Sequence, residues 1–114
     1  MNESVNAAKS SHDENQLMKY SKATLKLNIN VRKAIQLATL EVDGLQRIDY
    51  SVDWSNFPNS LNMNATLAQE PCANNTLSAE ETDAINKIIQ RCFLKFGIKF
   101  RDIRKNISLQ INQN

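Results

Sequence analysis

Residues that could carry out catalysis are few in this chain and poorly placed for it. The only histidine, His12, lies in a polar N-terminal stretch, where a rigid catalytic geometry is not expected. Cys92 falls on the apolar stripe of a predicted helix, which favours core packing over nucleophilic use. Cys72 lies in a predicted loop, and the folded part offers no histidine to activate its thiol. The sequence has no glycine-rich phosphate loop and no Cys-x-x-Cys or His-Glu-x-x-His motif, so we expect no enzymatic activity.

Two carboxylates could be considered for a metal site. Asp49 and Asp53 share one face of a predicted strand, four residues apart, which separates them by about 13 Å. That distance is too large for a shared metal ion without a third ligand from Asn62 or Asn64. We therefore expect no metal ion and no cofactor, and no small-molecule substrate is evident.

Basic residues form the second candidate for a functional site. The chain has 114 residues and a formal net charge of +2, but the middle is acidic and two flanking segments, 16–34 and 87–114, are basic. Clustered cations can contact phosphates whatever the nucleotide sequence. Nucleic-acid binding by a regulator is accordingly the alternative function. The residues that would carry it are Lys87, Arg91, Lys95, Lys99, Arg101, Arg104 and Lys105.

Aromatic residues at a predicted turn form the third candidate. Trp54, Phe57 and Pro58 cluster there, and Leu94 falls off the apolar stripe of its helix. Aromatic side chains are frequent anchors in protein interfaces. The competing interpretation is that Trp54 belongs to the core and Phe57 covers its edge. We predict a non-enzymatic binding or regulatory protein that acts through protein–protein contacts. Its partner would be another protein or a second copy of the chain, which would bind through the second predicted helix (the one that contains Leu94) or through a sheet edge.

The elements that would position these residues follow from hydrophobic periodicity. Residues 30–43 predict a helix with Asn30 as N-cap and Gly44 after its end. Residues 24–30 alternate apolar and polar side chains, so they fit either a strand or an extension of this helix. Segments 46–54 and 61–68 alternate strictly and predict an antiparallel hairpin.

The C-terminal part predicts a helix and a last strand. Ser78 and Glu81 form a capping box, and the helix they begin should stop at Gly97. Residues 106–112 alternate again and predict a strand. The expected fold is α+β, with two helices on one face of a small three-stranded antiparallel sheet, order αββαβ, and the last strand beside the first. A ferredoxin-like βαββαβ order is the alternative if residues 24–30 form a strand.

Domain organisation and location also follow from composition. Residues 1–16 contain almost no large apolar group and predict a disordered tail, which leaves 17–114 as a single domain. No apolar run approaches 18 residues, so we expect no membrane span. The N-terminus lacks the basic start and apolar segment of a secretory signal, which favours a cytoplasmic location.

Three stretches of the sequence resemble a known family. They are Val42-Asp43-Gly44, the turn Phe57-Pro58-Asn59-Ser60-Leu61, and Asp102-Ile103-Arg104-Lys105 before the last strand. They resemble a family of short, uncharacterised gamma-proteobacterial proteins, some of them labelled Fis family transcriptional regulators. The resemblance spans roughly residues 28–112 and supports a helix ending at Asp43-Gly44. A Fis-type helix-turn-helix needs two helices joined by a short turn, whereas here two strands separate the predicted helices.

Overall fold

The computed structural model describes residues 21–68 and 77–112. The predicted tail 1–16, His12 and Cys72 lie outside these residues. The described elements are α2 (Lys22–Glu41), β2 (Leu45–Ser51), β3 (Asn62–Leu67), α3 (Ala79–Leu94) and β4 (Ile107–Ile111), with the short 3-10 turns η1 (Trp54–Asn56) and η2 (Ile103–Lys105).

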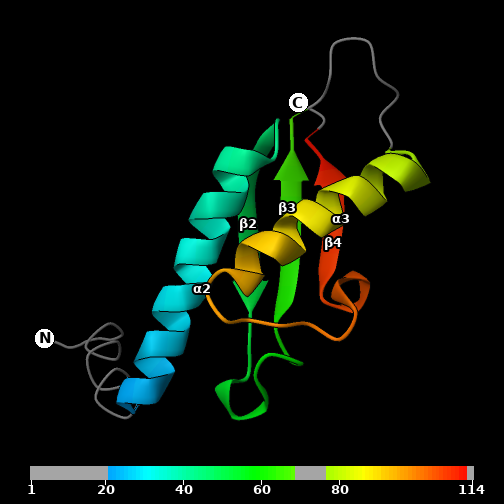
Figure 1. The fold of residues 1–114 in the computed structure, drawn as a ribbon. Coiled ribbons are helices and arrows are strands. Elements are labelled where there is room, and N and C mark those ends of the chain that lie inside the picture. Colours follow the sequence, from blue (N-terminus) through cyan, green and yellow to red (C-terminus); the bar gives the residue numbers. More distant parts are fainter. Residues whose placement is uncertain (1–20, 69–76, 113–114) are drawn as a thin grey trace, which may run out of the picture.

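The fold is α+β, with both helices on one face of a three-stranded sheet (Figure 1). The order αββαβ confirms the predicted sequence of elements. Within the described ranges, neither helix is both long enough and apolar enough to cross a membrane.

The N-cap of helix α2 lies nine residues before the predicted one. Ser21 is the N-cap, and its hydroxyl accepts a hydrogen bond from the backbone N–H of Thr24 at 3.1 Å. Asn30 therefore lies inside the helix, and the strand that a ferredoxin-like order would need is absent from residues 24–30. No turn residue interrupts the chain between this segment and the rest of the helix, so the extension continues the same hydrogen-bonded ladder.

Strand β4 occupies a different place from the predicted one. Strands β2 and β3 form the expected antiparallel hairpin, from Leu45 opposite Leu67 to Ser51 opposite Asn62. Strand β4, however, lies beside β3 and runs parallel to it, so the prediction of a purely antiparallel sheet with the last strand beside the first is wrong. Helix α3 returns the chain across the face of the sheet, and such a crossover lets the next strand enter at the same end as the previous one.

The core lies between the sheet and the two helices. The largest fully buried side chains include Phe93, Leu61 and Ile89, and Ala34 and Ala38 of α2 are also completely buried. Small side chains at these positions of α2 allow its backbone to lie close to the core. These contacts join all five regular elements in one hydrophobic cluster.

Both ends of α3 have the geometry that their sequence predicts. The Ser78 hydroxyl accepts from the N–H of Glu81 at 3.0 Å, and the Glu81 carboxylate accepts from the N–H of Ser78 at 2.9 Å. After the helix, Gly97 has a φ of 79°, and the N–H of Ile98 donates to the carbonyl of Phe93 at 3.0 Å. This is a Schellman closure, for which glycine is the preferred residue.

Candidate interaction surface

The turn after β2 is held by a compact set of hydrogen bonds. The Asp53 carboxylate accepts from the N–H of Ser55 at 3.0 Å and from its hydroxyl at 2.7 Å. These bonds lower the pKa of Asp53. The Ser60 hydroxyl accepts from the N–H of Asp53 at 2.9 Å and donates to its carbonyl at 2.7 Å. The strand predicted to reach Trp54 therefore ends at Ser51, because Asp53 starts a 3-10 turn instead.

A second brace reaches this turn from the other end of the chain. The side-chain amide of Asn106 lies 2.8 Å from the carbonyl oxygen of Leu61, 3.2 Å from that of Asn59 and 3.5 Å from that of Pro58. Asn106 is 7% exposed, so these contacts are shielded from water. The turn is consequently fixed to the segment before β4 as well as to its own hairpin.

Three side chains on this turn form what we call the aromatic corner: Trp54, Phe57 and Pro58. The rings of Trp54 and Phe57 are tilted by 35°, with centroids 5.4 Å apart. All three residues are half-buried, and the two aromatic ones pack against the edge of the core. Both rings therefore belong to the edge of the core and remain partly accessible to solvent.

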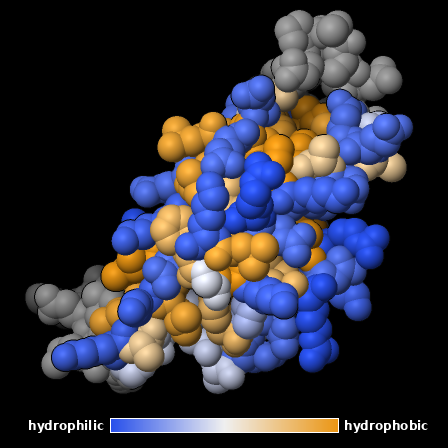
Figure 2. All heavy atoms as spheres, viewed as in Figure 1, coloured by the Kyte–Doolittle hydropathy of each residue, from blue (hydrophilic) through white to orange (hydrophobic). Residues whose placement is uncertain are grey.

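Apolar surface also remains on the helices. Leu94 is 47% exposed on the last turn of α3, Ile29 is 50% exposed and Leu40 is 83% exposed. Figure 2 shows apolar groups scattered among polar ones over the helix-covered side of the molecule. Leu94 lies on a separate element from the aromatic corner, which is at the lower end of the sheet in Figure 1.

Most of the predicted cations of α3 are engaged by carboxylates. Glu41 at the end of α2 lies 3.5 Å from Arg91 and 3.5 Å from Lys95. Burial raises the pKa of Glu41, but the two cations outweigh burial, and the net shift is downward. Lys87 pairs with Asp83 at 3.4 Å.

The segment after α3 keeps more of its positive charge accessible. Arg104 is held by Asp102 through two contacts, at 2.9 and 3.0 Å. Lys99, Arg101 and Lys105 are exposed and have no ion-pair partner within residues 21–68 and 77–112. The predicted basic cluster is therefore divided into four paired and three unpaired cations.

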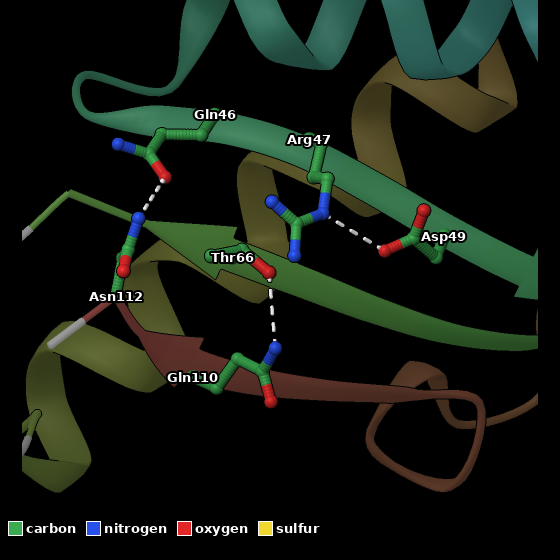
Figure 3. A network of polar contacts seen from close by, with 6 residues as sticks. All are labelled: Gln46, Arg47, Asp49, Thr66, Gln110 and Asn112. Carbon is green, nitrogen blue, oxygen red and sulfur yellow. Dashed lines mark hydrogen bonds and ion pairs between the residues drawn. The ribbon is translucent and has the colours of Figure 1, made fainter. Parts of the chain in front are cut away.

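The uncovered face of the sheet is polar and lacks aromatic side chains among the described strands. Figure 3 shows three contacts on it: Arg47 with Asp49, Gln110 with Thr66, and Asn112 with Gln46, each at 3.0 Å. A hollow of about 490 Å³ beside them is lined by Asp49, Asn62 and Asn64, among others. Without a stacking platform, this face does not resemble the RNA-binding surface of a four-stranded recognition sheet.

Groups with reactive chemistry are not brought together in the described part of the chain. Cys92 is fully buried, and burial, followed by the nearby Glu41 carboxylate, raises the pKa of its thiol. No three His, Cys, Asp or Glu side chains within residues 21–68 and 77–112 are arranged to hold a metal ion. Asp53, considered above as a metal ligand, is engaged in the turn.

Two residues that sequence reasoning missed organise these surfaces: Glu41 and Asn106. Glu41 contacts cations 50 and 54 positions away in the chain, and Asn106 contacts carbonyls at least 45 positions away. Neither residue stands in a recognisable motif. Comparison with protein families, curated proteins and solved structures finds no match for this chain.

Proposed function

We propose that this protein is a non-enzymatic binding or regulatory protein and that a protein partner docks on the aromatic corner. The observation that carries the proposal is a partly exposed aromatic pair on a turn braced by Ser60 and Asn106. A rigid aromatic anchor loses little conformational entropy on binding, which is why such residues dominate interface energetics.

The test compares two truncations of exposed apolar side chains. The wild-type chain, Phe57→Ala and the control Leu40→Ala are used as baits in the source cells with quantitative mass spectrometry, and each is sized by analytical ultracentrifugation. We expect Phe57→Ala to weaken a specific partner or a homodimer by about tenfold or more, whereas Leu40→Ala retains it. A strict monomer with no partner sensitive to Phe57→Ala would overturn the proposal.

Nucleic-acid binding is the second candidate, and the unpaired cations Lys99, Arg101 and Lys105 favour it. A gel shift against duplex DNA and single-stranded RNA at low salt tests it, since phosphate contacts weaken steeply as salt rises. Under this hypothesis Arg101→Ala reduces binding more than Arg91→Ala, because Arg91 is already occupied by Glu41. The absence of a salt-sensitive shift excludes it.

A further inference from the structure

One side of helix α2 carries a cluster of cations that no described carboxylate neutralises. Lys22, Lys26, Arg32 and Lys33 are exposed and have no ion-pair partner within residues 21–68 and 77–112. In a helix with 3.6 residues per turn, positions 22, 26, 29 and 33 form one stripe, and position 32 lies beside it. The four cations therefore share the side of α2 that faces away from its buried residues.

An apolar side chain lies at the centre of this cluster. Ile29 is 50% exposed and does not belong to the hydrophobic cluster of the core. Lys26, Arg32 and Lys33 are its neighbours on the helix surface, because they lie three or four positions away in the chain. We define the α2 outer face as the five residues Lys22, Lys26, Ile29, Arg32 and Lys33.

The charges of the surrounding elements leave the outer face positive. Glu41 is the only carboxylate in α2, and it lies eight residues beyond Lys33, about 12 Å along the helix axis. Arg91 and Lys95 of α3 already contact it, each at 3.5 Å. Asp43 is exposed but lies beyond the end of the helix, and the two charged residues of β2 pair with each other. The outer face thus complements an anionic partner.

The shape and composition of the outer face favour a lipid surface over a protein or a nucleic acid. Helix α2 forms one outer edge of the molecule, and hydrophilic and apolar groups are interspersed along it (Figure 1 and Figure 2). The outward side of a single helix is convex and offers no groove for a peptide, and lysine is depleted in protein interfaces. The phosphates of a nucleic acid would match the cations but would leave Ile29 in water.

An anionic bilayer accommodates both kinds of side chain. An apolar group can enter the boundary between headgroups and acyl chains, while lysine and arginine side chains extend to the headgroup phosphates. Lys22 and Lys33 are eleven residues apart, about 17 Å along the helix axis, so a flat surface can contact all four cations at once.

We propose that the α2 outer face binds the surface of an anionic phospholipid bilayer, with the axis of α2 parallel to the membrane and Ile29 inserted at the headgroup boundary. Binding of this kind is peripheral and reversible, so it needs no membrane-spanning helix. The inference does not rest on docking of a protein at the aromatic corner.

The test measures how much of the full chain sediments with lipid vesicles. The full chain is used so that residues 1–20, which precede α2, are present. Vesicles of phosphatidylcholine alone are compared with an equal mixture of phosphatidylcholine and phosphatidylglycerol, at about 0.01 M and 1 M salt, where the Debye length is about 30 Å and 3 Å. We expect binding to the anionic vesicles at low salt and its loss at high salt. No binding to the anionic vesicles, or equal binding to the neutral ones, would overturn the proposal.

Two double variants with the same change in net charge locate the site. Each cation near an anionic bilayer strengthens binding about fivefold, so Lys26→Gln with Lys33→Gln should lower the partition coefficient about 25-fold. Glutamine is a good helix former, so this variant should keep α2 intact. The control, Lys99→Gln with Lys105→Gln, removes two exposed and unpaired cations after α3 and should lower it less than about threefold. Equal losses would mean that binding follows net charge rather than this face.

A pair of single variants tests the apolar contribution. Ile29→Ala should weaken binding to the anionic vesicles about fivefold, because it removes methyl and methylene groups that enter the boundary. Leu94→Ala is the matched control, since Leu94 is 47% exposed and lies on α3. If Ile29→Ala bound as tightly as Leu94→Ala, insertion of Ile29 would be refuted.

Polyanion competitors distinguish the bilayer from the other anionic partners. Duplex DNA and a polyglutamate peptide are added to the vesicles at the same concentration of negative charge. Neither accommodates Ile29, so each should displace only a minor part of the bound chain. Complete displacement by either one would assign the outer face to that polyanion and overturn the proposal.

Discussion

Single side chains decide how the turns of this protein are held. Asn106 contacts three backbone carbonyls of the hairpin turn, and Ser78 closes the first turn of α3. In both cases a short polar side chain satisfies backbone groups that the regular elements leave unpaired.

Replacing Asn106 by alanine tests the first of these contacts. Asn106→Ala leaves buried carbonyls without a donor, so we expect the free energy of unfolding to fall by about 1–3 kcal/mol. Urea unfolding followed by circular dichroism measures it. The neighbouring change Asn59→Ala removes an exposed side chain and should cost less than about 0.5 kcal/mol. Equal losses for the two variants would show that the amide contacts do not stabilise the turn.

Replacing each partner of the capping box tests its two hydrogen bonds separately. Ser78→Ala removes the hydroxyl that accepts from the N–H of Glu81 and should destabilise the protein by about 1 kcal/mol at neutral pH. The backbone N–H of Ser78, and after it the side chain of Ser78, lower the pKa of Glu81 below its ordinary value of 4.5. A lowered carboxylate pKa stabilises the fold above the unfolded-state value, and this contribution disappears as the pH falls through the folded-state value. The difference between wild type and Glu81→Gln should therefore shrink below about pH 4.5 in thermal melts. A difference that stays constant down to pH 2 would contradict this assignment.

At the scale of elements, the contact between α2 and α3 positions much of the surface. Ala34 and Ala38 of α2 are fully buried in the core that the helices share with the sheet, and Glu41 joins the end of α2 to Arg91 and Lys95. The ion pairs reduce the free positive charge of α3.

A larger side chain in this core should be poorly tolerated. Ala38→Leu places extra volume where no space remains, and we expect a loss of about 1–3 kcal/mol in the free energy of unfolding. Ala23→Leu makes the same change on an exposed turn of α2 and serves as the control. Denaturant unfolding of both variants gives the comparison. If Ala38→Leu were as stable as Ala23→Leu, close packing around Ala38 would not be a constraint.

The elements also show what the sequence can and cannot predict. The capping box at Ser78 and the stop at Gly97 are local signals, and both were predicted correctly. The position of β4 in the sheet was predicted wrongly. The alternation of Ile107, Leu109 and Ile111 indicates a strand, but it does not indicate which strand lies beside it. The aromatic corner was visible as a cluster of residue types, whereas its bracing by Asn106 depends on tertiary contacts.

At the scale of the whole molecule, one hydrophobic cluster connects both helices and all three strands. The aromatic corner touches this cluster, so its order should be lost only when the core is lost. The single tryptophan of the chain, Trp54, lies in the corner and reports on it directly.

This arrangement predicts cooperative unfolding. Trp54 fluorescence and far-ultraviolet circular dichroism should give the same urea midpoint, as expected for a small two-state domain. As a control, near-ultraviolet circular dichroism should give that midpoint too. An earlier fluorescence transition would mean that the corner opens independently of the core.

The parallel placement of β4 has a consequence during protein synthesis. Because β4 follows α3 in the chain, the ribosome releases β2 and β3 first, and the side of β3 that β4 will later occupy remains uncovered until the residues after Asn106 emerge. Uncovered strand edges and apolar faces are the features that molecular chaperones recognise in unfinished chains. Slowing of translation just before Ile107 should therefore prolong the interval in which the nascent chain is vulnerable to aggregation.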